Sequence, residues 1–406
     1  MKPISDHVIA LLTAVASDTT AGKSGKFSKD VTESAKQWLA QLRQHAPDTV
    51  MHLEAADNPN AIDADVIEKV KQVTAQQPDV RAAMEQMTAV LAATASSLND
   101  SAELYRYQGQ YAEAEPLYHD SLKILRTVLG DRHPDTAAIL NNLALLYYSQ
   151  GRYAEAEPLY ENALEIMKSK LGDRHPETAC SLCNLAGLYE AQGRYAEAEP
   201  LYKESLEITR SVLGDRHPET ASSLNGLAGL YKCQSRYVEA EPLYKESLEI
   251  RKNVLGDRHP ETAGSLGNLA SLYECQGRYV EAEPLYKESL KIMKSELGDC
   301  HPNTGASLNN LAMLCQSQGR YAEAEPLHKE SLEIVRSVLG DRHPSTAASL
   351  NNLALLYSQT NRLPEAAATM SSVVSILLEN LGPTHPDTLA VQNNLKDIQQ
   401  AINGSA

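Results

Sequence analysis

Histidine is the residue type that first suggests chemistry in this sequence, because a His-Pro pair recurs along it at a fixed interval. The pairs begin at His133, His175, His217, His259, His301, His343 and His385, each 42 residues after the one before. Imidazole binds zinc and transfers protons near neutral pH. Each of these histidines nevertheless stands in the same connecting segment of its repeat, and no second ligand of fixed type accompanies it. The pattern therefore favours capping of a helix start, or packing of a loop, over a metal site.

Two further pairs of residues could carry chemistry, and both are better explained by structure. Cys180 and Cys183 are one helical turn apart and could form half of a zinc site, but the sequence holds no matching second pair. Paired carboxylates such as Glu155 and Glu157 could act as general acid and base. They recur in six copies at a helix start, where exposed acidic groups complement the helix dipole. We therefore predict no catalytic residue, no metal site and no cofactor, and hence no enzyme.

A third candidate is the segment Ala-Gly-Lys-Ser at residues 21–24, which follows an apolar run. A phosphate-binding loop needs a further glycine five places before its Gly-Lys-Ser, so that the backbone can curl around the phosphates. Ser17 stands at that place, and no alternation of strands and helices follows. The segment is therefore predicted to be a flexible loop.

Charge and cysteine usage limit the partners and the location. The formal net charge of −16 disfavours nucleic acid and anionic membranes, because both attract a basic surface. No apolar run reaches the roughly 18 residues that a membrane span needs. The six cysteines follow the repeat, which indicates reduced thiols and a cytoplasmic protein. The apolar residues 8–16 could alternatively belong to a secretion signal, but Asp6 and His7 interrupt its start, and an amphipathic helix is favoured.

The 42-residue period predicts the elements that position these residues, because a period of this size is typical of stacked-repeat proteins. Seven units span residues 94–387, and a half-unit follows to about residue 402. Apolar residues at helical spacing predict two helices in each unit, joined by a short Gln-Gly-Arg segment. Ser235 and Asn361 replace the glycine in two copies, which suits a helix end with positive φ. Pro158, near the start of a second helix, predicts that this helix begins late or bends there.

Residues 1–93 differ from the repeats, since they hold the only Phe and the only Trp and none of the 19 tyrosines. Apolar spacing of three and four predicts a small bundle of about four helices. The helices are expected around residues 4–15, 31–42, 66–73 and 80–91, and the loops at 19–29 and 45–61. No helix breaker separates Val80 from Tyr107, so the fourth helix is expected to continue into the first repeat.

The repeated core of Leu, Leu-Ala, Tyr, Gly, Tyr, Ala, Tyr and Ala resembles the tetratricopeptide repeat. The eight extra residues, the LNNLA-LY and YAEAEPLY helices and the LGDRHPET connection resemble more narrowly the kinesin light chain type of this repeat. The resemblance covers about residues 94–402. It implies an all-α fold, a right-handed α-solenoid of helix pairs with the small helical bundle at its N-terminus. The expected parts are a helical module at 1–93, seven units at 94–387, and a capping helix with a tail at 388–406.

The same resemblance implies a non-catalytic scaffold that binds a partner segment on the concave face of the superhelix. In such repeats an asparagine of the first helix grips the backbone or carboxylate of a peptide, and an amide suits this task because it both donates and accepts. The matching residues are Asn99, Asn141, Asn225, Asn309, Asn351 and Asn393. Cys183 and Gly267 take this place in the two other units. The adjacent asparagines are expected to satisfy polar groups between repeats, and they are Asn142, Asn184, Asn268, Asn310, Asn352 and Asn394.

Charge enters this face at Arg106, Glu190, Lys232 and Glu274, alternating in sign. Kinesin light chains are associated with acidic cargo peptides held by basic residues, and this face has few of them. The sequence therefore predicts a protein or peptide partner of mixed charge with apolar anchors. An alternative function is a sensor or regulatory arm of a signalling assembly, in which residues 1–93 recruit an effector.

Overall fold

The computed structural model describes residues 29–54, 62–383 and 385–404. Every element in these ranges is an α-helix, as the sequence predicted. Backbone contacts divide the chain into two compact units, Met1–Tyr105 with Ala112–Leu143 and Arg106–Tyr111 with Ala144–Ala406. The predicted helix around residues 4–15 and the Ala-Gly-Lys-Ser segment lie outside the described residues.

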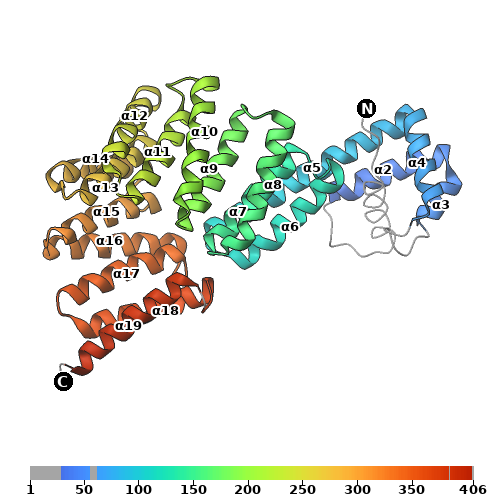
Figure 1. The fold of residues 1–406 in the computed structure, drawn as a ribbon. Coiled ribbons are helices and arrows are strands. Elements are labelled where there is room, and N and C mark those ends of the chain that lie inside the picture. The colour runs from blue at the N-terminus through green and yellow to red at the C-terminus, as the bar shows by residue number, and fades with distance from the viewer. Residues whose placement is uncertain (1–28, 55–61, 384, 405–406) are drawn as a thin grey trace. The chain divides into compact units, whose positions relative to one another are not determined.

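The first unit holds the N-terminal helices (Figure 1). They are α2 (Lys29–His45), α3 (Pro47–Glu54), α4 (Ala64–Gln76), α5 (Pro78–Tyr107) and α6 (Tyr111–Val128). Helices α2, α3 and α4 pack against one another, and Trp38, Leu42 and Leu53 are wholly buried. Helix α5 runs without interruption through residues 93 and 94, as the absence of a breaker predicted.

One predicted loop is partly helical. Helix α3 occupies Pro47–Glu54, inside the segment 45–61 for which we expected a loop. A proline at the first helical position is tolerated because its missing N–H would have no partner there, and Asp48 complements the positive end of the helix. Val50 and Leu53 are wholly buried. Tertiary packing therefore holds a helix that is too short to form alone.

The second unit is a stack of helix pairs (Figure 1). Its helices are α7 (Pro134–Ser149), of which the part from Ala144 belongs to this unit, α8 (Tyr153–Leu171), α9 (Pro176–Ala191), α10 (Tyr195–Leu213), α11 (Pro218–Cys233), α12 (Tyr237–Leu255), α13 (Pro260–Cys275), α14 (Tyr279–Leu297), α15 (Pro302–Ser317), α16 (Tyr321–Leu339), α17 (Pro344–Gln359), α18 (Leu363–Asn380) and α19 (Pro386–Gly404). From α10 to α16, each even-numbered second helix packs on the first helix before it and on the first helix after it. Consecutive first helices, such as α11 and α13, also contact one another.

The repeated histidine caps the start of the helix that follows it, from α7 onward. The Nδ1 atom of His175 accepts the backbone N–H of Glu177 at 3.2 Å, and Pro176 follows as the first helical residue. The same bond forms at His133, His217, His259, His301, His343 and His385. The Thr178 hydroxyl donates to the Gly172 carbonyl at 2.8 Å and closes the connecting loop. Helix-start capping, predicted from the sequence, is confirmed.

The turn between the two helices of a pair requires positive φ. This angle is 67° at Gly151 and 59° at both Ser235 and Asn361, which confirms the prediction. A side chain in this left-handed conformation costs roughly 1–2 kcal/mol, because its Cβ crowds the following carbonyl. Asparagine tolerates the conformation better than serine does, since its short polar side chain bonds locally.

The proline of the second helix does not delay the helix start. Helix α8 begins at Tyr153 and contains Pro158, so the late start is wrong, whereas the alternative of a bend at the proline stays a prediction. Arg152 holds the first turn, because its Nε and Nη2 atoms donate to the carboxylate of Glu155 at 2.7 and 2.6 Å. This ion pair stabilises the turn that precedes the proline.

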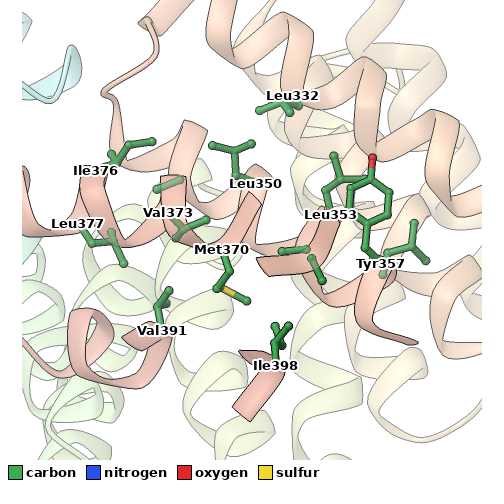
Figure 2. Close-up of a cluster of buried hydrophobic side chains, with 14 of the residues drawn as sticks. Leu332, Leu350, Leu353, Tyr357, Met370, Val373, Ile376, Leu377, Val391 and Ile398 are labelled. Atoms are coloured by element: carbon green, nitrogen blue, oxygen red, sulfur yellow. The ribbon is translucent and has the colours of Figure 1, made fainter. Parts of the chain in front are cut away.

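Helix α19 covers the C-terminal end of the stack. Met370 and Val373 of α18 belong to a buried cluster with Leu350 of α17 and with Val391 and Ile398 of α19 (Figure 2). Without α19, the apolar face of α18 would meet solvent. Each unit of a repeat array needs a neighbour to cover its apolar face, and α19 covers that of α18.

We expect Ser235→Gly to stabilise the protein. Glycine adopts positive φ without the steric cost that serine has at 59°, so the free energy of unfolding should rise by about 1 kcal/mol. Urea titration followed by circular dichroism measures the change. The control is the reverse change, Gly193→Ser. The φ angle of Gly193 is 72°, and an added Cβ atom would meet no atom within 4 Å. This variant should lose stability through backbone strain alone, and an unchanged midpoint for Ser235→Gly would contradict the prediction.

Candidate functional site

An arginine at the start of each second helix joins neighbouring units. The Nη1 atom of Arg194 donates to both carboxylate oxygens of Glu157, in the preceding second helix, at 2.7 and 2.8 Å. Its Nε and Nη2 atoms donate to Glu197 at 2.8 and 2.7 Å. The guanidinium carbon lies 4.0 Å from the centre of the Tyr189 ring. We name this set of one arginine, two glutamates and one tyrosine the arginine clamp.

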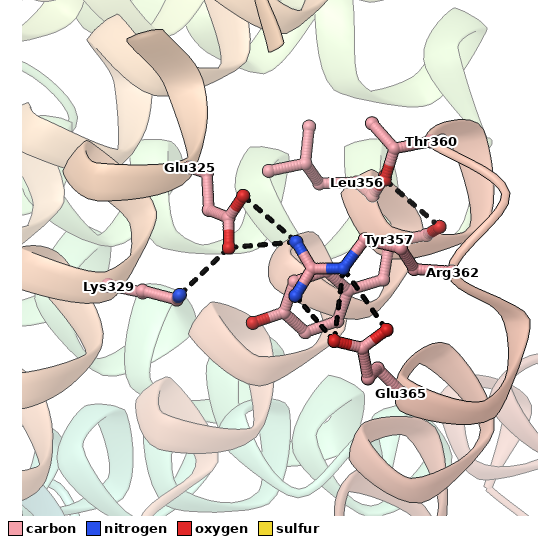
Figure 3. Close-up of polar contacts among 7 residues, drawn as sticks. All are labelled: Glu325, Lys329, Leu356, Tyr357, Thr360, Arg362 and Glu365. Carbon is pink, nitrogen blue, oxygen red and sulfur yellow. Dashed lines mark hydrogen bonds and ion pairs between the residues drawn. The ribbon is translucent and has the colours of Figure 1, made fainter. Parts of the chain in front are cut away.

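The arginine clamp recurs along the second unit. Its further copies are centred on Arg236, Arg278, Arg320 and Arg362, and in the Arg320 copy Cys315 stands in place of the tyrosine. Figure 3 shows the last copy, in which Arg362 bridges Glu325 and Glu365. The guanidinium lies over the ring of Tyr357, and Lys329 pairs with Glu325 at 2.8 Å. The clamp thus links each of these second helices to the second helix before it and, where the tyrosine is present, to the first helix between them.

These contacts explain the paired glutamates. Arg236, together with Lys203, lowers the pKa of Glu199 to about 2, so this carboxylate is ionised at neutral pH and is unsuited to general-acid catalysis. The side chain of Glu155 is 54% exposed, whereas that of Glu157 is 25% exposed. Only the first glutamate of the pair is therefore the exposed helix-start charge that we expected. The second glutamate forms an ion pair with the arginine of the next unit. The sequence analysis missed this pair, although the glutamate and the arginine are always 37 residues apart.

Some of the predicted amides bond to one another between units. The Nδ2 atom of Asn142 donates to Asn99 Oδ1 at 2.9 Å, and that of Asn352 donates to Asn309 Oδ1 at 3.0 Å. In these two pairs the second amide of one unit satisfies the first amide of the unit before it. Asn142 and Asn352 therefore fill the inter-repeat role predicted for them, and the oxygens of Asn99 and Asn309 are already engaged.

Other predicted site residues retain unused polar atoms. The Oδ1 atoms of Asn225 and Asn351 are buried and accept no hydrogen bond within the described residues. The Nε atom of Arg106, on α5, is likewise buried without a hydrogen-bond acceptor there. Asn141 is half-buried, and Asn393 is exposed. A buried polar atom without a partner costs roughly 1–3 kcal/mol, so Asn225 and Asn351 are the amides with capacity for an external donor.

The predicted charged positions are half-buried and engaged with neighbouring side chains. Glu190 and Glu274 each accept a hydrogen bond of 3.0 Å from a buried tyrosine of the following second helix, Tyr202 and Tyr286 respectively. Burial, reinforced by the adjacent carboxylate, raises the pKa of both tyrosines, so both remain donors. Lys232 donates to a serine hydroxyl of α13 at 3.2 Å. The three charged side chains thus hold fixed positions.

His328 of α16 is a polar residue that the sequence analysis missed. It replaces the buried tyrosine of the preceding second helices and is itself wholly buried. Its Nδ1 atom lies 3.0 Å from Asn309 Oδ1, and its Nε2 atom lies 3.1 Å from Gln316 Oε1. Since a neutral imidazole has one N–H, it donates a hydrogen bond to one of these two amide oxygens. Burial lowers the pKa of His328 to about 4, so the ring is neutral at physiological pH.

The cysteines and acidic residues form no clustered site in the part of the chain that the structure describes. There, no three His, Cys, Asp or Glu side chains come together as metal ligands would. The Cys183 sulfur lies 3.0 Å from the Ser205 hydroxyl, and burial raises the pKa of this thiol. A thiol with a raised pKa is a poor nucleophile, because the thiolate is the reactive form. No helix in the described ranges is long and apolar enough to cross a membrane.

Known proteins share this architecture. A family model described as tetratricopeptide repeat matches residues 93–169, 135–211, 177–253, 219–295 and 303–379, which together make up more than half of the chain. No curated protein sequence matches. The chain is similar to the kinesin light chain TPR-like repeats of Podosopora anserina, with 29% identity over 50% of this chain and 97% of that chain and a TM-score of 0.42.

Two other solved structures are similar at lower identity. BtubC (BKLC) from P. vanneervenii has 23% identity, with 62% of this chain and 92% of that chain covered and a TM-score of 0.44. The apo form of RapI has 14% identity, with 70% and 97% covered and a TM-score of 0.51. At this identity the likeness to RapI shows the fold alone.

We expect acidification to destabilise the protein through His328. In the unfolded chain a histidine takes up a proton below its ordinary pKa of 6.5, whereas folded His328 does so only near 4. Its contribution to stability is therefore complete above about pH 6.5 and is lost as the pH falls toward 4. His328→Tyr restores the residue that most other units have. Between pH 6.5 and pH 4, the free energy of unfolding of this variant should fall by about 2 kcal/mol less than that of the wild type. Urea titrations of both proteins across this pH range test it, and parallel pH profiles would refute it.

Proposed function

This chain belongs to the tetratricopeptide repeat family, and we propose that it is a non-catalytic scaffold whose first helices bind a segment of another protein. We define the first-helix face as the surface formed by α9, α11, α13, α15 and α17. The observation that carries the proposal is the pair of buried amide oxygens on this face, Asn225 Oδ1 and Asn351 Oδ1, which lack donors within the described chain.

The two amides suit an extended backbone. Each asparagine as a whole is only half-buried, and rotation about its χ2 angle, which is broadly permitted, turns the oxygen toward a partner. An amide then accepts a backbone N–H and donates to a backbone carbonyl, whatever side chains the partner carries. Because neighbouring first helices contact one another, equivalent positions form a row along the stack. A row of this kind supports a partner that runs across several units.

The chemistry of the first-helix face supports a partner of mixed charge. Glu190, Lys232 and Glu274 alternate in sign on successive first helices, and all three are half-buried. Met313 of α15 is 42% exposed, and its sulfur lies 3.6 Å from the Asn309 amide nitrogen. An exposed methionine adapts its shape to apolar side chains of different size. A segment with charges of both signs and an apolar anchor therefore fits this face.

A regulatory arm is the second candidate function. Helix α5 carries the chain from the N-terminal helices into the first repeat without a break. The hydroxyl of Ser121 in α6 donates to the Ala95 carbonyl in α5 at 2.7 Å. A change in the order of the first repeat would therefore be transmitted to the N-terminal helices through α5. For either function, the six free cysteines support a reducing, cytoplasmic location.

We expect Asn225→Ala combined with Asn351→Ala to weaken partner binding while leaving stability unchanged or higher. The two oxygens make no hydrogen bond within the described part of the free protein, so their removal costs no folding energy, whereas each bond lost to a partner costs about 1 kcal/mol. The affinity should therefore fall about tenfold or more. Peptides selected from a displayed random library by the full-length protein are the probes, and isothermal titration calorimetry measures their affinity.

The matched control is Asn184→Ala, which removes an exposed amide from α9 and should leave affinity unchanged. Equal affinities of the wild type and the double variant would contradict the role of these amides. A library that yields no binding peptide would contradict the proposed function as a whole.

A further inference from the structure

A pocket of about 440 Å³ opens on the first-helix face between α13 and α15. Two glycines of α13, Gly264 and Gly267, line it. The equivalent residues of the neighbouring units carry side chains, and they are Cys180, Ser222 and Ala306 for the first glycine and Cys183, Asn225 and Asn309 for the second. A Cβ atom at Gly264 would meet no atom within 4 Å, and one at Gly267 would meet only Ser289 Oγ, at 3.9 Å. The pocket is therefore open because α13 has no side chain at these two positions.

The wall of the pocket contains a buried arginine. Arg251 of α12 lines the pocket, and its side chain is only 12% exposed. The equivalent residues of the other units are mostly apolar, and they are Leu125, Met167, Thr209, Met293, Val335 and Leu377. An arginine has thus replaced a core residue in one unit, next to the position where the adjacent unit has lost two side chains.

The charge of Arg251 is incompletely compensated within the described chain. Its Nη1 atom donates to Ser265 Oγ at 2.8 Å and to the Glu261 carbonyl oxygen at 3.5 Å, and its Nη2 atom donates to Ser222 Oγ at 3.3 Å. The Nε atom is buried and makes no hydrogen bond in the described structure. The carboxylate of Glu261 lies 3.6 Å from Nε, but this side chain is 54% exposed. Burial lowers the pKa of Arg251, in keeping with a cation that its surroundings do not fully stabilise.

We propose that this pocket is an anchor subsite that receives one acidic side chain, aspartate or glutamate, of the segment bound to the first-helix face. The inference rests on the proposed function and names one contact of that site. A guanidinium with a free donor pairs best with a carboxylate, which accepts two parallel hydrogen bonds. Ala263 and Met293 offer apolar contact for the methylene groups, and the exposed amides of Asn268 and Asn310 lie at the pocket lining.

Alignment of the repeats with one another gives variants that test the subsite with little risk to the fold. Arg251→Met installs the residue that two other units already have at this position, so the urea midpoint should stay the same or rise. Gly264→Ala places a methyl group in the open pocket without a clash. Arg258→Met is the control for general electrostatics, because this arginine does not line the pocket and its side chain is 76% exposed.

The probes are peptides selected from the random library by the full-length protein, together with copies in which each Asp or Glu is replaced by Asn or Gln. We expect one acidic position to be shared among the peptides. Its neutralisation should lower affinity on the order of tenfold for the wild type and hardly at all for Arg251→Met. Both pocket variants should bind the unchanged peptide on the order of tenfold more weakly, and Arg258→Met should bind it normally.

Three results would overturn the inference. Peptides that respond to Asn225→Ala with Asn351→Ala but bind both pocket variants at wild-type affinity would refute the subsite and leave the proposed function intact. A shared acidic position whose neutralisation weakens binding equally in the wild type and Arg251→Met would place the contact elsewhere. The absence of any binding peptide would refute the subsite and the proposed function together. If Arg251→Met does not fold, the affinity of Gly264→Ala for the unchanged peptide tests the subsite, and wild-type affinity would refute it.

Discussion

Each helix pair of this protein can bury its apolar face only against its neighbours, and the arginine clamp adds directional hydrogen bonds where second helices of neighbouring units meet. The guanidinium of Arg236 is held by Glu199 of the preceding second helix and by Glu239 of its own, and it lies on the ring of Tyr231. A planar group with donors in a rigid fork satisfies these three partners in one arrangement. Hydrophobic burial has no direction of its own. The clamp therefore adds a directional contact to the non-directional burial that holds neighbouring units together.

Comparison of the units with one another separates residues that maintain geometry from residues that are free to serve a partner. The histidine caps and the clamp arginines are the same in nearly every copy. The departures include Cys183 in the third unit and Arg251, Gly264, Gly267 and His328 in the fourth to sixth units. Each one replaces the residue of the neighbouring units with a different polar group or with empty space. On the first-helix face, Gly264 and Gly267 leave a space that identical units would lack.

The helix pairs, the histidine caps and the positive φ at Ser235 could be predicted from the sequence, because each follows from a local pattern that the repeats display many times. Helix α3 could not, since tertiary burial of Val50 and Leu53 stabilises it. The ion pair of Glu157 with Arg194 joins residues 37 positions apart and appears only once the pairs are stacked. The amides illustrate the same limit: their positions were predictable, but which oxygens lack a partner depends on contacts between units.

The unpartnered groups on the first-helix face lower the stability of the free protein, and the architecture explains why they are tolerated. In a repeat array the total stability is approximately a sum of unit and interface contributions. Arg251 lies between Arg236 and Arg278 in the chain, and the ion pairs of these two clamp arginines join its unit to both neighbours. A partner that hydrogen-bonds the buried polar groups adds its binding free energy to the same interfaces. Binding at the pocket beside Arg251 would therefore stiffen the fourth and fifth units first, because the groups that the partner satisfies belong to them.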